Sequence, residues 1–252
     1  MELVESWTRS TRSAQFELRR IDPIYLSQHG FDSLASGEAL VAITDRPPSR
    51  NEIESFGDRQ LEGVRIGFYG YALYVSRTNP LDSVYAGHLR YLFQRKLTDW
   101  KELGGPAVGL EGPIRLIGPE KGTRGGEILL RQAQIWFDQP TWETRPTDAQ
   151  VVEDVAADPM AIGFAAIGLD QQVRYLGLRM ERNSAPAFPS LEEIESERYG
   201  LAKVIYVFYV APASPEVSAL LDYLFSDEGA AALRSTNVWP LPRRRATVML
   251  GS

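Results

Sequence analysis

Ile117-Gly118-Pro119-Glu120-Lys121-Gly122-Thr123-Arg124-Gly125-Gly126-Glu127 places glycines, a hydroxyl and two cations between two regular elements. Upstream, residues 113–117 form a short apolar-rich run that predicts a strand. Downstream, residues 127–137 carry apolar side chains at helical spacing, which predicts a helix. A strand, a glycine-rich loop and a helix start therefore follow one another, which is the local order of an α/β protein.

The loop in this stretch has the composition of an anion site. The first backbone N–H groups of a helix lack partners within the helix, and the helix dipole is positive at that end, so an oxyanion there meets donors already in position. Gly122, Gly125 and Gly126 let the backbone approach a ligand closely. The alternative interpretation is an ordinary surface turn with a glycine helix cap.

Composition excludes several classes of function. The chain has 252 residues, 44% hydrophobic and 24% charged, enough for one large or two modest cores. A net charge of -6 argues against nucleic acid as a partner. Cysteine is absent and His29 and His88 are the only histidines, so we expect no metal, no cofactor and no thiol or histidine catalysis. No run approaches the roughly 20 apolar residues of a membrane span.

The rest of the chain alternates between strand and helix patterns. Ser49 with Glu52 predicts a capping box at a helix over 50–56. Residues 81–93 read as mostly helical, and residues 2–12 as an opening helix. The run at 203–210 is apolar on both faces and predicts a central strand. Further strands are predicted at 40–43, 64–75 and 161–166, and further helices at 149–157, 215–225 and 227–235.

Several segments, in chain order, resemble the phosphate-binding proteins of ABC phosphate transporters and their wider solute-binding family. Tyr71 to Leu81 resembles the crossover strand with its Asn-Pro ending, and Lys96-Leu97-Thr98-Asp99-Trp100-Lys101-Glu102-Leu103-Gly104-Gly105 resembles "G-K-I-T-N-W-x-x-L-G-G". Residues 113–117 leading to Gly122-Thr123-Arg124 are similar to "P-I-x-V … S-G-T-R", and residues 161–164 to "A-I-G-Y". Residues 226–229 and 239–241 resemble the closing helix and "G-Y-x-P-L".

The resemblance implies an α/β, two-lobed periplasmic-binding-protein fold with mixed central sheets and a ligand cleft between the lobes. Lobe 1 would comprise residues 1–74 and 175–252, and lobe 2, with the anion loop, residues 75–174. It further implies a monomeric, non-enzymatic protein, periplasmic or extracellular, that closes around phosphate or a related oxyanion for an ABC transporter membrane component. An enzyme such as a phosphatase would need a nucleophile with a base, or a metal cluster, and the sequence presents neither pattern.

The resemblance carries over the binding residues one by one. Thr44 and Asp45 match the family's "S-D" pair, in which the carboxylate accepts a proton from bound phosphate and so selects it over fully ionised sulfate. The alternative for Asp45 is a turn residue before two prolines. Ser27 falls where the family has a serine at a helix start. In the loop, Gly122, Thr123 and Gly125 would supply donors and Arg124 a cation, while Lys121 replaces the family's serine.

Two departures from the family favour a second hypothesis. The arginine that family members often carry upstream of the loop is replaced by Gly118 or Pro119, and the family's first strand would precede residues 2–7. We therefore expect a chain that lacks the first strand and leaves an open sheet edge beside residues 39–43. The alternative function is a sensor or interaction domain with the same fold and a degenerate anion site.

Overall fold

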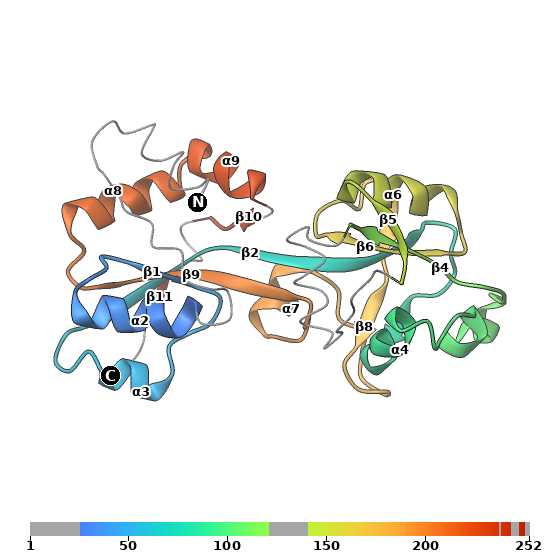
Figure 1. Ribbon diagram of the computed structural model, residues 1–252, viewed down its shortest axis with the longest axis horizontal. Coiled ribbons are helices and arrows are strands. Elements are labelled where there is room, and N and C mark those ends of the chain that lie inside the picture. The colour runs from blue at the N-terminus through green and yellow to red at the C-terminus, as the bar shows by residue number, and fades with distance from the viewer. Residues whose placement is uncertain (1–25, 121–140, 237, 243–246, 250–252) are drawn as a thin grey trace. The chain divides into compact units, whose positions relative to one another are not determined.

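The computed structural model describes residues 26–120, 141–236, 238–242 and 247–249 (Figure 1). The chain divides into two compact units, residues 1–69 with 203–252 and residues 70–202. The bounds expected from the sequence are 1–74 with 175–252 and 75–174. They place the return of the chain from the second unit to the first earlier than the structure does. Residues 199–202 stay with the second unit because Tyr71 N–H donates to Leu201 O at 3.0 Å and Tyr199 Oη donates to Tyr71 O at 3.2 Å.

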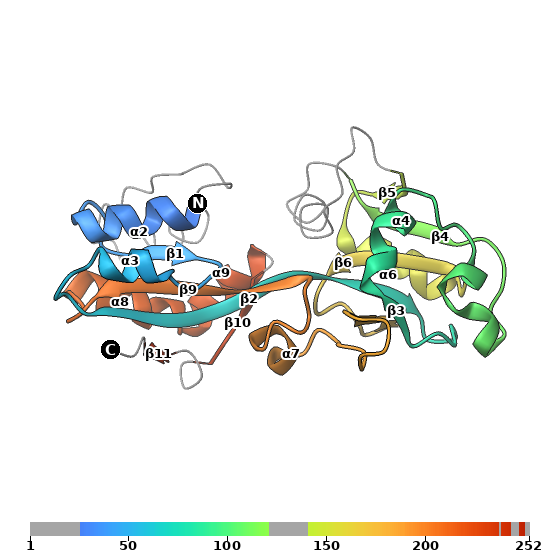
Figure 2. The ribbon, with the colours of Figure 1, turned by 90° about the horizontal axis from the view of Figure 1, so that it is seen from below.

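Unit 1 is a sheet with helices on both faces (Figures 1 and 2). Strand β9 (Ala202–Val210) lies between β1 (Ala42–Thr44) and β2 (Leu61–Ser76), as its two-faced apolar pattern predicts, and it pairs antiparallel with β1. Two short strands, β10 (Trp239–Pro240) and β11 (Thr247–Met249), pair antiparallel with β2. Within the described chain, β1 pairs with β9 alone.

Alternate side chains of β9 fill the two cores of this unit. Phe208 belongs to the core under α2 (Leu26–Ser36) and α3 (Arg50–Glu54), and Val207 to the core under α8 (Pro215–Leu224) and α9 (Asp227–Ser235). The larger core also contains Val64, Ile66, Tyr209, Val217, Leu220, Leu221, Tyr223, Leu224, Leu233 and Val238. Burying both faces explains why β9 carries almost no polar residue.

Unit 2 contains a mixed sheet built on the second half of β2. Strand β6 (Ala161–Ala166) pairs antiparallel with β2, β4 (Arg115–Pro119) pairs parallel with β6, and β5 (Glu143–Arg145) pairs parallel with β4. Strand β7 (Val173–Tyr175) pairs antiparallel with β2. Helix α6 (Asp148–Ala157) packs on β6 and β4 through Val151, Val152 and Val155.

The predicted helix over 81–93 is wrong in its first half. Residues Ser83–Tyr85 form β3, which pairs parallel with β8 (Gly177–Arg179), and a short 3₁₀ turn η1 (Ala86–His88) leads into α4 (Leu89–Phe93). The pairing joins residues 94 positions apart, which a local pattern does not reveal. The other helices of the described ranges are short: η2 (Trp100–Leu103), η3 (Gly105–Val108) and α7 (Leu191–Glu195).

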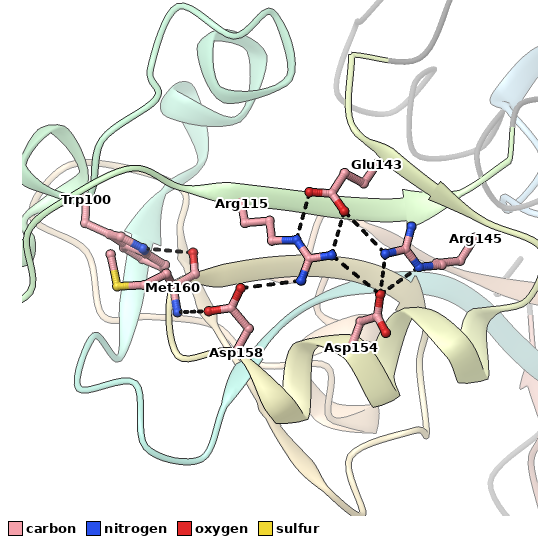
Figure 3. A network of polar contacts seen from close by, with 7 residues as sticks. All are labelled: Trp100, Arg115, Glu143, Arg145, Asp154, Asp158 and Met160. Atoms are coloured by element: carbon pink, nitrogen blue, oxygen red, sulfur yellow. Dashed lines mark hydrogen bonds and ion pairs between the residues drawn. The ribbon is translucent and has the colours of Figure 1, made fainter.

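The segment 96–105 has a structural role in unit 2. Asp99 caps η2 in a capping box with Glu102, and Gly104 ends it with a φ of 98°. Trp100 is fully buried, and its Nε1 donates to the Met160 carbonyl at 3.1 Å, just before β6 (Figure 3). The tryptophan therefore ties the η2 turn to the start of a central strand.

Candidate functional site

In unit 1, the turn after β1 carries the predicted pair Thr44 and Asp45. Thr44 is buried, and its hydroxyl donates to the Arg46 carbonyl at 2.8 Å, which closes the turn. The carboxylate of Asp45 is exposed and accepts a hydrogen bond from the Tyr69 hydroxyl at 2.9 Å. Asp45 thus stands at the carboxyl end of β1 with its orientation fixed by a residue of β2.

A partly buried ion pair holds this turn in place. The Arg46 guanidinium donates to both carboxylate oxygens of Glu52, at 2.8 and 2.7 Å, and lies 5.5 Å from the centre of the Phe31 ring. Glu52 also accepts from the Ser49 N–H at 2.6 Å, which completes the predicted capping box. The Arg46 hydrogen bonds lower the pKa of Glu52 to about 2. The cation of Arg46 is therefore neutralised, while the Asp45 carboxylate remains exposed to solvent.

The first turn of α2 lies toward the same end of β1. Ala39 N–H bonds Ser33 O at 3.0 Å, and a Cβ on Gly30 would lie 3.4 Å from that of Ala42, so α2 and β1 run in opposite directions. Ser27 lies in the first turn of α2, and Thr44 and Asp45 lie together at the end of β1. That Ser27 joins them in one site stays a prediction.

In unit 2, the predicted anion loop leaves from the carboxyl end of β4. Lys121, Gly122, Thr123, Arg124 and Gly125 lie outside the described residues. Their flanks are described: Glu120 N–H bonds Arg145 O at 3.1 Å, and Trp142 Nε1 donates to Pro119 O at 3.0 Å. Strand β4 lies between the parallel strands β5 and β6, and carboxyl ends of parallel strands are where ligands of α/β sheets bind.

Aromatic packing fixes both flanks of the loop. The rings of Phe93, Trp142 and Phe164 meet edge to face, with centroids 5.0 to 5.8 Å apart. A Cβ on Gly118 would lie 2.1 Å from the Phe164 ring, so glycine is required there. This packing gives a physical reason why no arginine stands at position 118, upstream of the loop.

Ion pairs reinforce the same flanks from outside (Figure 3). Arg115 at the start of β4 donates to both oxygens of Glu143 on β5, at 2.7 and 2.6 Å, and pairs with Asp158 at 3.5 Å. Arg145, at the end of β5, bonds Asp154 on α6 through its Nε at 2.6 Å. Hydrogen bonds to Glu143 raise the pKa of Arg115. Both guanidinium groups are paired with carboxylates and have a structural role.

Asp148, which the sequence analysis did not single out, lies shortly after the carboxyl end of β5. It opens α6 directly after β5, and its Oδ1 is buried with no hydrogen-bond partner in the described part of the chain. Burial raises its pKa, and the Ala166 amide partly offsets that rise. An acidic residue in a first helical turn is common, so the sequence alone carried no signal. Tyr69 was missed because its bond to Asp45 spans 24 residues.

No group of three or more His, Asp or Glu side chains that could hold a metal ion exists among residues 26–120, 141–236 and 238–242. No described helix combines the length and the apolar character that crossing a membrane requires.

Comparison with known proteins gives a consistent fold. Residues 26–228 match the model of a PBP superfamily domain, whereas no curated protein sequence matches the chain. An ABC-type phosphate transport receptor from Vibrio cholerae is 19% identical, with a TM-score of 0.59 over 95% of this chain and 93% of that one. PstS from Borrelia burgdorferi is 15% identical, with a TM-score of 0.64 over 95% and 92%.

A third structure has a higher TM-score. A possible phosphate binding protein from Planctomyces limnophilus DSM 3776 is 16% identical, with a TM-score of 0.72 over 96% of this chain and 88% of that one. At these identities the likeness establishes the fold, and it agrees with the α/β, two-lobed architecture expected from the sequence.

Proposed function

The chain belongs to the PBP superfamily, and from that premise we propose that it is a solute-binding protein for phosphate or a related oxyanion. We further propose that it acts without catalysis, outside the cytoplasm, and delivers its ligand to an ABC-type transporter. The name of the Vibrio structure, an ABC-type phosphate transport receptor, supports this direction, as does that of the Planctomyces structure, a possible phosphate binding protein. The chain covers 93% of the first and 88% of the second.

The observation that carries the ligand proposal is the exposed Asp45 carboxylate, held by Tyr69 at the end of β1. A carboxylate accepts hydrogen bonds and repels a fully ionised anion. An anion that still carries a proton can instead donate that proton's hydrogen bond to Asp45. Phosphate is protonated at neutral pH and sulfate is not, so Asp45 would favour phosphate.

The loop of unit 2 would supply the hydrogen-bond donors and the positive charge that bind the anion. Backbone N–H groups at Gly122, Thr123 and Gly125 would donate to oxygen atoms, and Lys121 or Arg124 would contribute charge. Ser27 and Thr44 would add hydroxyl groups. The Thr44 hydroxyl already donates its proton to Arg46 O. While that hydrogen bond persists, the hydroxyl oxygen can only accept a hydrogen bond from a protonated ligand.

Isothermal titration calorimetry with phosphate, sulfate and molybdate tests the proposal. We expect saturable heat with phosphate below millimolar concentration and weaker heat with sulfate. Asp45→Asn should keep phosphate affinity within severalfold but tighten sulfate binding about tenfold, because the amide no longer repels it and can donate a hydrogen bond. Asp58→Asn, which removes an exposed charge in a turn of the same unit, is the matched control and should change neither affinity.

The proposal fails if no oxyanion gives heat at millimolar concentration. That result would favour the alternative function, a sensor or interaction domain with a degenerate anion site. If phosphate binds but Asp45→Asn leaves the ratio of phosphate to sulfate affinity unchanged, the role of Asp45 is wrong while solute binding stands.

A further inference from the structure

A second group of basic side chains lies in unit 2, at η1, at the end of β8 and in the turn that follows β8. It consists of His88, Arg179 and Arg182, arranged around the ring of Tyr85. Tyr85 and Arg179 are directly opposite each other in the parallel pairing of β3 with β8. The His88 ring meets the Tyr85 ring edge to face at 5.3 Å, and the Arg182 guanidinium lies 5.4 Å from the Tyr85 centroid.

Gly87 makes this arrangement possible. A Cβ at position 87 would lie 2.3 Å from the Tyr85 ring, so only glycine lets the ring approach the backbone this closely. In this position the ring contacts the His88 imidazole and the Arg182 guanidinium. Arg179 is tied to the same turn, since its Nη1 donates to the Arg182 carbonyl at 3.2 Å.

Two nitrogen atoms in this group are buried without a partner. These are Nδ1 of His88 and Nε of Arg179, and neither has a hydrogen bond within the described chain. Buried polar atoms nearly always have a hydrogen-bond partner, and an ion or a water molecule is one explanation for an exception. Two such atoms in one cluster of basic side chains point to a missing group that accepts hydrogen bonds.

The charges of the group are also uncompensated. In the described part of the chain, neither Arg179 nor Arg182 forms an ion pair, and the nearby acids are used or exposed: Asp82 pairs with Arg174 at 3.5 Å, and Glu181 is exposed. Burial and the two positive charges lower the pKa of His88. Arg115 and Arg145 show the contrasting case, in which every guanidinium meets carboxylates (Figure 3).

We propose that His88, Arg179 and Arg182 form a second oxyanion site, for a small divalent anion of the phosphate or sulfate type. Such an anion would accept hydrogen bonds from the two orphaned nitrogens and balance the positive charge. Arg182 is exposed and rests on Tyr85 by a surface cation–π contact, which is weak enough to yield to an entering anion. Its guanidinium would then close over the ligand as a third donor.

The two histidines make the site measurable by NMR, because His88 and His29 are the only imidazole signals of the chain. The imidazole pKa of His88 is measured in inorganic phosphate, in sulfate, and in NaCl of equal ionic strength. We expect either oxyanion to raise this pKa by about 0.5 to 1 unit more than NaCl does, since a bound anion favours imidazolium.

Variants distinguish this second site from the phosphate site proposed above. Arg182→Gln, an exposed change that leaves Tyr85 in place, should at least halve the shift, and Arg179→Gln should abolish it. Arg90→Gln, on the adjacent α4, removes an exposed charge and should leave the shift intact. Asp45→Asn should also leave it intact, so failure here is distinguishable from failure of the proposed function. A His88 shift no larger in phosphate and sulfate than in NaCl, or one unchanged in Arg179→Gln, overturns the proposal.

Discussion

The two strand ends that carry the predicted ligand residues are held by different forces. The turn after β1 in unit 1 is fixed by polar contacts: the Thr44 hydroxyl on Arg46 O, the Arg46–Glu52 ion pair, and Tyr69 on Asp45. The end of β4 in unit 2 is fixed chiefly by aromatic rings packed against Gly118. A turn held by charges responds to pH, whereas one held by packing responds to volume, and each can be disturbed separately.

The largest expected effect is on the packed strand end. Gly118→Ala should lower the free energy of unfolding by about 2 to 4 kcal/mol, because the new Cβ would lie 2.1 Å from the fully buried Phe164 ring. Urea denaturation followed by tryptophan fluorescence measures the change. Gly57→Ala is the control: position 57 has a φ of 59° and open space, so only backbone strain of about 1 kcal/mol applies.

A double mutant shows whether the Phe164 ring is the cause. In a Phe164→Leu background, the additional cost of Gly118→Ala should fall by at least half, since the ring edge that it meets is gone. Equal losses for Gly118→Ala and Gly57→Ala would show that the strand end is not held by this packing.

An intermediate effect is expected at the polar strand end. Glu52→Gln should lower the free energy of unfolding by about 1 to 2 kcal/mol at pH 7, allowing for the 40% exposure of the Arg46 side chain. Glu54→Gln, on the same helix, removes only the exposed pair with Arg50 and should cost at most about 0.5 kcal/mol.

The dependence on pH identifies the ion pair. The pKa of Glu52 is lowered from 4.5 to about 2 on folding, so its contribution is complete above pH 4.5 and is lost as the pH falls toward 2. The stability difference between wild type and Glu52→Gln should therefore shrink over that range in urea titrations at pH 7, 5, 4 and 3. A difference that stays constant from pH 7 to 3 would contradict the assignment.

The smallest change in stability is expected for Tyr69→Phe, which removes the donor to Asp45 from an exposed hydrogen bond. Unfolding free energy should change by no more than about 0.5 kcal/mol. Phosphate affinity in calorimetry should nevertheless fall about two- to fivefold, because the carboxylate loses its fixed orientation. Tyr91→Phe, at an exposed position of unit 2, should alter neither quantity. An unchanged affinity in Tyr69→Phe would remove Tyr69 from the site.

Much of this fold follows from local sequence patterns. The long β2, the two-faced β9, the buried β6 and the capping box at Ser49 all agree with prediction, because each depends on the nature of adjacent side chains. Pairings between distant segments did not follow, such as β3 with β8 or β10 with β2. These strands have two or three residues, too few for periodicity to mark.

The candidate site divides in the same way. Asp45 was found through its motif, and its exposed position at a strand end agrees with a ligand role that stays a prediction. Contacts between distant segments determine the surroundings of Tyr69, Asp148 and the His88 cluster. No spacing in the sequence predicts these contacts. Nor does the sequence tell which arginines are neutralised: Arg115 and Arg179 both stand at strand ends, but among the residues that the structure describes, only Arg115 pairs with carboxylates.

The position of β9 between β1 and β2 has a consequence for biosynthesis. The described strand residues of unit 2 lie within residues 70–202, including the second half of β2, so that unit can complete this sheet while the chain is still growing. Unit 1 cannot, because β1 must wait for a partner that begins 158 residues after it ends, at Ala202. Strand β1 is thus synthesised long before it can pair, and a chain that ended before Ala202 would contain the strands of unit 2 but would lack the β9 partner of β1.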